Sequence, residues 1–271
     1  RLSVRMASPR TSYACAALLH AVQAVRATPC LVDSDPWSFN MDPEAARKTC
    51  TPRAKALIVV HSFGLPAELD ALRELGLPLI EAGAHALGAT YRGRPVGSIG
   101  EIAVFSFYAT KLITTGEGGM LLGNDARLLV AARDSREYDQ KGDGRPRFNY
   151  KLTDLQAALG LAQLDRLAEF LRRREEITAR YREQLHALPV ESPLAPPDRE
   201  RIYYRYVVKG PVSADHYLTR LQALGVEARR PVFQPLHRYL GGGDFPGAED
   251  AWRRAVSLPL HHQAWLFRRR R

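Results

Sequence analysis

Short apolar runs alternate with stretches of helical periodicity through the first half of the chain. Strands are expected at residues 30–32, 57–60, 79–81, 102–105 and 120–122, with helices between them such as 42–50 and 67–75. Strands separated by helices of this length form crossover units, so the pattern predicts a largely parallel sheet covered by helices on both faces. This part of the chain is expected to be a large α/β domain.

The second half of the chain has a different pattern. Leucines 155, 159, 161, 164 and 167 recur at helical spacing after Thr153, which predicts one long amphipathic helix from residue 153 to residue 188. Four prolines follow within residues 189–198, and then come a strand (203–208), a helix (213–224) ended by Gly225 and a second strand (226–229). We therefore predict a large domain at 1–188, a linker at 189–198 and a small α+β domain at 199–271.

The N-terminal part contains an apolar stretch, residues 13–25, after a basic start, which superficially fits a secretory signal. His20 and Gln23 interrupt the run, and apolar residues recur in it at helical spacing, so an amphipathic helix is favoured. No run reaches the roughly 18 apolar residues that a membrane span needs. The three cysteines cannot all pair and match no metal spacing, as is typical of a reducing compartment. We expect a cytoplasmic protein without a membrane partner.

Charge raises a second class of function. The 271 residues have a formal net charge of +10, as in proteins that bind nucleic acids or anionic membranes. The arginines are dispersed except at 172–174 and 268–271, however, and no nucleic-acid-binding motif is present. An anionic cofactor and a nucleotide-linked substrate would also favour a positive field, so we expect small-molecule partners and no nucleic acid.

One lysine stands where a reactive amine would be useful. Lys111 ends the run Phe-Ser-Phe-Tyr-Ala-Thr-Lys, just before a glycine-rich turn at 114–119, which places its amine at the mouth of a strand. Lysine is rare in this chain, because arginine supplies 33 of the 39 basic residues. A lysine kept here indicates a titratable amine that could form an imine with a cofactor. A surface lysine after a buried strand is the alternative.

Several motifs around Lys111 occur in one order along the chain. They are Val-Val-His-Ser-Phe-Gly at 59–64, Glu-Ala-Gly-Ala-His at 81–85, Gly-Ser-Ile-Gly at 97–100, the lysine motif and Phe-Asn-Tyr-Lys-Leu-Thr-Asp at 148–154. With these motifs the chain, from about residue 7 to residue 260, resembles the DegT/DnrJ/EryC1/StrS family of pyridoxal-phosphate-dependent aminotransferases, which act on nucleotide-linked sugars and related ketones. The resemblance implies a fold-type-I large domain with a small C-terminal domain, pyridoxal 5'-phosphate as the cofactor, and a homodimer.

The resemblance also implies roles for individual residues. Lys111 would hold the cofactor as an imine and then move a proton between the cofactor and the substrate carbon. Ser106 would bind the cofactor phosphate, His85 would lie beside the cofactor ring, and Asn149 would reach the phosphate bound in a partner subunit. The last three also have structural interpretations, as a strand-end serine, a buried histidine and a turn residue before a helix.

The chain departs from the family pattern at the cofactor-binding position 82. The family has an aspartate there, which pairs with the pyridine nitrogen and keeps it protonated, whereas this chain has Ala82. Its absence removes a charge-assisted hydrogen bond of roughly 1.5–3 kcal/mol and weakens the cofactor as an electron sink. The ring-stacking position is open between Tyr13 and Cys15, and the role of Glu117 in the glycine-rich turn is open too.

The ends of the chain also differ from the family pattern. We expect an N-terminally truncated member that lacks the helix start whose amides hold the phosphate, with a different tail after Leu260. The predicted function is amino transfer from an amino acid, glutamate or glutamine, to a keto group on a nucleotide sugar or a related ketone, in polysaccharide or antibiotic biosynthesis. The alternative is a catalytically impaired homologue that serves as a non-catalytic partner subunit, which Ala82 and the late start favour.

Overall fold

A six-stranded sheet forms the centre of the protein. The computed structural model describes residues 7–260, and the strand order is β2-β1-β3-β4-β7-β8. The strands are β1 (Ala7–Thr11), β2 (Thr28–Val32), β3 (Leu57–Val60), β4 (Leu79–Ala82), β7 (Ile102–Ser106) and β8 (Gly119–Gly123). All neighbouring pairs are parallel except β7 and β8. The predicted largely parallel sheet is confirmed, and β1 is a strand that the apolar pattern did not indicate.

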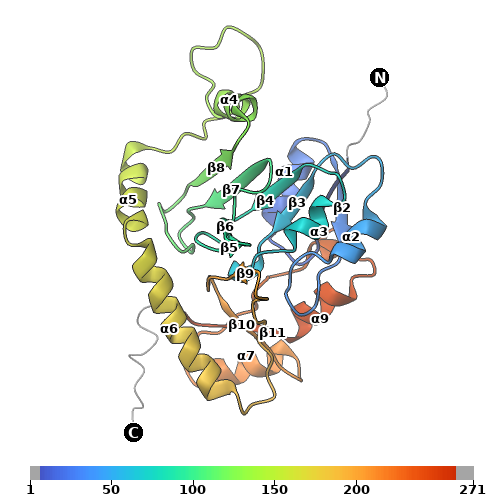
Figure 1. Cartoon of the computed structure of the whole chain (residues 1–271), viewed down its shortest axis with the longest axis vertical. Coiled ribbons are helices and arrows are strands. Elements are labelled where there is room, and N and C mark those ends of the chain that lie inside the picture. Colours follow the sequence, from blue (N-terminus) through green and yellow to red (C-terminus); the bar gives the residue numbers. More distant parts are fainter. Residues whose placement is uncertain (1–6, 261–271) are drawn as a thin grey trace.

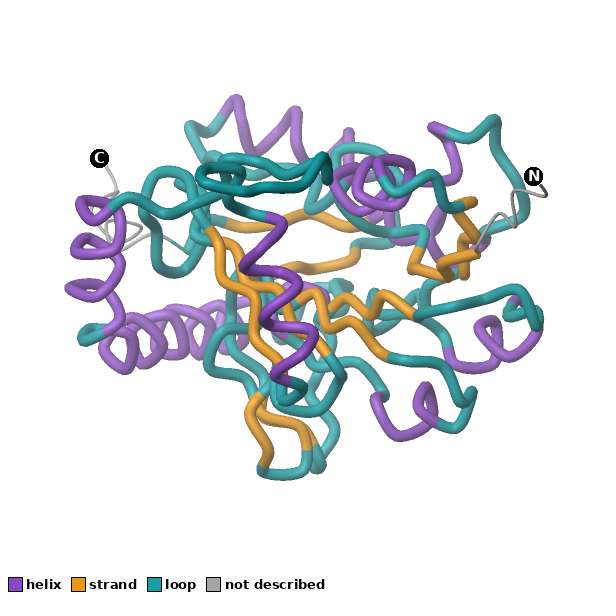
Figure 2. Tube along the Cα trace, turned by 90° about the horizontal axis from the view of Figure 1, so that it is seen from above, coloured by secondary structure: helices purple, strands orange, loops and turns teal. Residues whose placement is uncertain are grey.

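Helices cover both faces of this sheet (Figure 2). On one face Val60 of β3 packs with Leu19 of α1 (Ala16–Ala24), so the helix expected within residues 13–25 is confirmed. On the other face Val59 packs with Ala46 of α2 (Pro43–Thr49) and Leu72 of α3 (Leu69–Arg73). Successive strand residues point to opposite faces, so β3 is buried on both sides and consists only of apolar residues. A short 3-10 helix, η1 (Ser62–Gly64), follows β3.

The expectation of one helix over residues 153–188 is wrong. The segment forms α5 (Asp154–Leu164) and α6 (Leu167–Leu185), separated at Asp165 and Arg166. Thr153 caps α5 as predicted, in a capping box with Gln156. The other end of α5 is tied to the glycine-rich turn, because the Gln163 amide bonds both backbone groups of Thr114 at 3.1 and 2.7 Å. The chain changes direction directly after this attachment and continues as α6 (Figure 1).

The C-terminal part has its own small sheet and helices. Strands β10 (Tyr206–Lys209) and β11 (Ala255–Leu258) pair antiparallel, and α7 (Ala214–Ala223), α8 (Leu236–Tyr239) and α9 (Pro246–Arg254) lie between them in the sequence. The strand expected at 226–229 is wrong, because only Arg229 forms a bridge, to Ser257. The amide of Val226 instead bonds the carbonyl of Leu221 and ends α7, so this segment starts in a helix-terminating turn.

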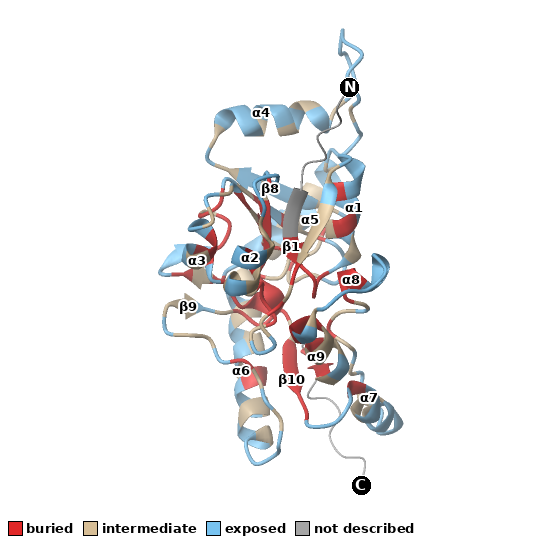
Figure 3. Cartoon of the chain, turned by 90° about the vertical axis from the view of Figure 1, so that its right-hand side faces the viewer, coloured by how far each residue is buried: buried red, intermediate tan, exposed pale blue. Residues whose placement is uncertain are grey.

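Two further features complete the fold. A three-stranded sheet of β5 (Thr90–Tyr91), β6 (Arg94–Pro95) and β9 (Arg199–Glu200) joins residues far apart in the sequence. Helix α4 (Ala126–Ser135) has no buried residue and projects from the body with the loop after it (Figures 1 and 3). Within residues 7–260, no helix combines the length and the apolar character that crossing a membrane requires. The domain limits at 188 and 198 stay a prediction.

Candidate active site

Three parallel strands end side by side at the carboxyl edge of the sheet. Ala82 closes β4, where it pairs with Val60 of β3 and with Val104 of β7, and β7 ends two residues later at Ser106. Ligands of open α/β sheets bind at this edge, because the loops that follow the strands converge there. The segments with His85 and Lys111 are two such loops.

The loop with Lys111 is closed by backbone hydrogen bonds across its base. The Phe107 amide bonds the Gly118 carbonyl at 2.8 Å, and the Thr115 amide bonds the Phe107 carbonyl at 2.9 Å. Gly118 has φ +153, and a β-carbon there would lie 2.3 Å from the Thr115 hydroxyl, so this turn requires glycine. The closed loop leaves the Lys111 side chain half-buried. Glu117 is exposed, and its carbonyl accepts hydrogen bonds from Thr115 and Gln156.

The amine of Lys111 lies over an aromatic ring from the C-terminal part of the chain. Its Nζ is 5.0 Å from the centre of the Tyr204 ring. The same ring stacks on His85, with the centroids 4.2 Å apart and the planes 14° apart. Phe63 stacks on His85 as well, at 5.8 Å. Lys111 and His85, which the sequence analysis singled out, are therefore brought together by Tyr204.

The electrostatics of this group follow from burial and from two cations. Burial, with the positive charges of Lys111 and Arg205, lowers the pKa of His85 well below its usual value, so the imidazole is neutral. Its Nδ1 is buried and has no hydrogen-bond partner among residues 7–260. Burial alone would raise the pKa of Tyr204, but Lys111, a hydrogen bond with Thr110 and Arg205 lower it overall.

Within the motif at 81–85, Glu81 has a structural role, and Ala82 ends β4 at the carboxyl edge of the sheet. The carboxylate of Glu81 is fully buried and accepts hydrogen bonds from the amides of Gly97, Ile99 and Gly100 and from Nε2 of His61. These bonds outweigh the cost of burial and lower the pKa of Glu81 to about 2. Glu81 therefore fixes the 97–100 loop, and the next residue, Ala82, offers only a methyl group.

The two candidates for the ring-stacking position have different surroundings. Tyr13 is fully buried, with its ring 5.9 Å from Phe39 and 6.3 Å from Phe63, whereas Cys15 is exposed. The hydroxyl of Tyr13 donates to the Ala251 carbonyl at 3.5 Å, and burial raises its pKa. Tyr13 thus belongs to the packing around the edge, and the choice between the two residues stays a prediction.

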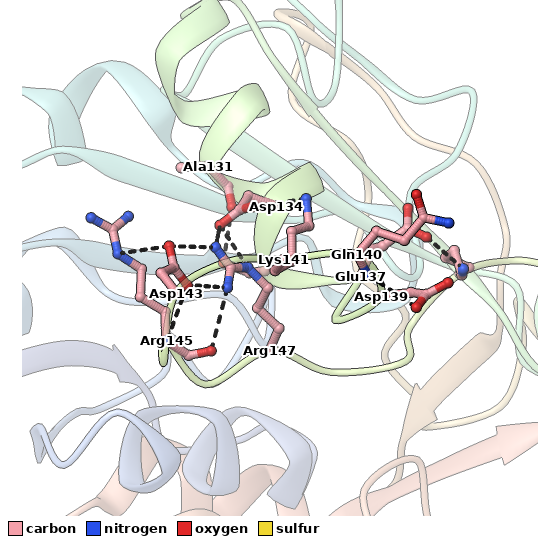
Figure 4. A network of polar contacts seen from close by, with 11 residues as sticks. Ala131, Asp134, Glu137, Asp139, Gln140, Lys141, Asp143, Arg145 and Arg147 are labelled. Atoms are coloured by element: carbon pink, nitrogen blue, oxygen red, sulfur yellow. Dashed lines mark hydrogen bonds and ion pairs between the residues drawn. The ribbon is translucent and has the colours of Figure 1, made fainter.

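Asn149 lies apart from the other candidates, on the projecting loop between α4 and α5. The loop is organised by Arg147, whose side chain is only 5% exposed and bonds Asp134 at 2.9 Å and Asp143 (Figure 4). The rings of Phe148 and Tyr150, on either side of Asn149, stack 4.9 Å apart. Asn149 itself is exposed, and the amides of Phe148 and Tyr150 on either side of it bond the carbonyls of Ser135 and Arg136 at the end of α4.

Sequence reasoning missed three residues of the site. Tyr204 and Arg205 fall within the strand predicted at 203–208, but the structure begins β10 only at Tyr206 and places both residues in a bend before it. Phe63 comes from a motif used only for the resemblance. The available signal was the run 201–206, Arg-Ile-Tyr-Tyr-Arg-Tyr, which mixes aromatic and cationic residues. The approach depends on Gly64, because a β-carbon there would lie 2.0 Å from the carbonyl oxygen of Ile202.

An α/β fold with a lysine, a neutral histidine and a strand-end serine at its carboxyl edge is the architecture of a group-transfer enzyme. The model of the DegT/DnrJ/EryC1/StrS aminotransferase family matches residues 9–265, and the chain belongs to this family. The family consists of pyridoxal-phosphate-dependent aminotransferases.

Similar proteins agree with this membership. GDP-perosamine synthase of Caulobacter vibrioides is 38% identical over 255 residues, which cover 87% of this chain and 68% of that protein. Spore coat polysaccharide biosynthesis protein SpsC of Bacillus subtilis is 34% identical, with 87% and 69% covered. The crystal structure of DesV from S. venezuelae superposes with a TM-score of 0.88 at 33% identity, with 94% and 73% covered. The fold is that of the fold-type-I sugar aminotransferases.

Proposed function

We propose that the protein transfers an amino group from glutamate or glutamine to the keto group of a nucleotide-linked sugar, with pyridoxal 5'-phosphate as cofactor and Lys111 as the catalytic residue. The main support is the position of Lys111, which is half-buried at the carboxyl edge of the sheet with its Nζ 5.0 Å from the Tyr204 ring. The proposal of a nucleotide-linked sugar is supported by DesI, which is 32% identical to this chain and whose crystal structure was determined in the presence of its TDP-sugar product.

The residues at this edge fit such a cofactor in all but one respect. Lys111 supplies an amine, Ser106 supplies a hydroxyl at the end of β7, and His85 supplies a neutral ring with an unpartnered buried Nδ1. An exposed asparagine, Asn149, is available to a second subunit. The exception is Ala82, which offers no carboxylate to the pyridine nitrogen.

Each side chain would then have a separate task. Pyridoxal phosphate, when bound, supplies an electron sink for the bonds at the donor α-carbon. Lys111 would attach it covalently and, after its release, accept and return a proton at Nζ. Ser106 would donate a hydrogen bond from Oγ to the phosphate. His85 would cover one side of the site and exclude water.

A dimer is supported by exposed apolar side chains close to Asn149 in the sequence. Leu155 and Leu161 of α5 are 86% and 63% exposed, and Phe148 and Tyr150 beside Asn149 are 51% and 71% exposed. Apolar side chains that recur on a helix and are largely exposed in the single chain indicate a subunit interface. We therefore propose a homodimer in which Asn149 reaches the partner's phosphate. Sedimentation of the wild type and of Leu155→Glu tests it, and a monomeric wild type would contradict it.

The function is tested by direct product analysis. The protein with added pyridoxal phosphate is incubated with glutamate or glutamine and a GDP- or dTDP-linked keto sugar, and amino sugar and 2-oxo acid are measured by mass spectrometry. The control for Lys111→Ala is Lys55→Ala, which removes an exposed lysine before β3. We expect product from the wild type and Lys55→Ala and none from Lys111→Ala. Equal product from all three would contradict the role of Lys111.

One observation favours a second candidate function. Ala82 removes the acid that would pair with the cofactor nitrogen, so the chain could instead stabilise a catalytically complete partner. Cofactor binding without any product from the wild type, across both donors and both classes of acceptor, would favour this non-catalytic role.

A further inference from the structure

Tyr204 occupies a fixed place between the two parts of the fold. Its backbone carbonyl accepts a hydrogen bond from Arg174 of α6 at 3.0 Å, and its ring is 93% buried between His85 and the Arg205 guanidinium, whose central carbon is 5.4 Å from the ring centre. Two residues before Tyr204, the amide of Ile202 donates a hydrogen bond to the Gly64 carbonyl at 3.0 Å. The ring is therefore held by both the sheet edge and the long helix.

The Lys111 amine has an unusual electrostatic environment. Among residues 7–260 it forms no ion pair with a carboxylate. Its charge acts on His85 from the loop after β4 and on Tyr204 from the segment before β10, and the charge of Arg205 acts on the same two groups. Two of these three do not attract an ammonium group, since His85 is neutral and Arg205 is a cation. The negative face of the Tyr204 ring is the one favourable partner that this part of the structure provides for the charge.

We propose that Tyr204 is a positioning residue for Lys111 and that its aromatic face holds the lysine ammonium at the carboxyl edge of the sheet. The inference deepens the proposed function, on which its catalytic meaning rests, because an amine that must attach a cofactor and later move protons needs a defined place when it is free. It also makes the position of the lysine depend on the C-terminal part of the chain. A displacement of β10 would move the ring and thereby the amine.

The test measures the reactivity of each lysine in the protein without cofactor. The chain is treated briefly with isotopically labelled acetic anhydride at pH 8, and the acylation rate of Lys111 is obtained by peptide mass mapping relative to the exposed Lys48. Loss of the ring face destabilises the unreactive ammonium form, so Lys111 should be acylated about two- to fivefold faster in Tyr204→Leu than in the wild type. Tyr204→Phe keeps the ring, so its Lys111 should be acylated at the wild-type rate.

A second series separates the charge contact from packing, and it also serves if Tyr204→Leu does not fold. Phenylalanine analogues with one, two and three ring fluorines at position 204 keep the shape and progressively weaken the negative ring face. The acylation rate of Lys111 should rise with each fluorine. The inference would be overturned if the acylation rate of Lys111 did not change with the number of fluorines, or if Tyr204→Phe changed that rate as much as Tyr204→Leu.

The same samples distinguish this inference from the proposed function. Reduction of the cofactor-loaded protein with borohydride shows whether Lys111 takes a pyridoxyl group. If it does not, while its acylation still follows the ring series, the proposed function fails and the contact stands. If Lys111 takes the group and its acylation ignores the series, the contact fails and the function stands.

Discussion

Glu81→Gln should be among the most destabilising single changes at the candidate site. The substitution keeps the shape of the side chain and removes its charge, and the new amide group would face one of four donors, the amides of Gly97, Ile99 and Gly100 or Nε2 of His61. The pKa of Glu81 is lowered from 4.5 to about 2. At 1.36 kcal/mol per pKa unit, the native contacts favour the charged form by about 3 kcal/mol.

The pH dependence of this effect has a definite sign. Because the folded-state pKa is lower than the unfolded-state pKa, the stabilisation by Glu81 is fully present above about pH 4.5 and is lost as the pH falls toward 2. Urea unfolding at pH 7 should therefore show Glu81→Gln about 3 kcal/mol less stable than the wild type, with a difference that shrinks below pH 4.5. The control is Glu74→Gln, whose side chain is 69% exposed, with an expected change within about 0.5 kcal/mol. A loss below about 1 kcal/mol at pH 7, or one independent of pH, would refute the reasoning.

Three other predictions concern single substitutions. Ala82→Asp should speed the glutamate half-reaction at least tenfold, about 1.4 kcal/mol, in stopped-flow absorbance, and Lys111→Ala should abolish the gain; no change would favour the non-catalytic role. Arg10→Met should raise the free energy of unfolding by about 2–3 kcal/mol, because the guanidinium is fully buried, finds no hydrogen-bond partner in the described part of the chain, and has its pKa lowered to about 10 by burial; a destabilised variant in urea unfolding would contradict this. Ser12→Ala should lower that free energy by about 1–3 kcal/mol, because it removes the 2.6 Å hydrogen bond to buried His237, whereas an unchanged urea midpoint would show that the bond is dispensable.

The strands of the large sheet could be predicted because they are short, apolar and separated by helices. β3 consists of four consecutive buried apolar residues, which a solvent-exposed segment would not show. β1 escaped prediction because Arg10 and Thr11 are polar, although both are fully buried in the sheet. Local composition indicates a buried strand only where the buried residues are also apolar.

The break at Asp165 and Arg166 could not be predicted for a different reason. Helical spacing continues through it, and the break directly follows a contact distant in sequence, the attachment of Gln163 to Thr114. The leucines of α5 were expected on one face of an amphipathic helix, but Leu155, Leu159, Leu161 and Leu164 are all exposed in the single chain, so helical spacing alone does not tell which side chains are covered.

The sequence predicts those parts of the candidate site that follow neighbouring strands of the sheet. Lys111 and His85 follow adjacent strands of a parallel sheet, so their convergence follows from topology. Tyr204 is contributed by a segment more than ninety positions away, and its approach depends on the absence of a side chain at Gly64. Contacts of that kind require the packed structure.

The covalent attachment of the cofactor at Lys111 is the central claim, and one measurement tests it directly. The purified protein is saturated with pyridoxal phosphate, reduced with borohydride, digested and mapped by mass spectrometry across all six lysines. We expect a pyridoxyl group on Lys111 and none above background on the other five lysines, with no labelled peptide in Lys111→Ala. A pyridoxyl group on another lysine, or none at saturating cofactor, would contradict it.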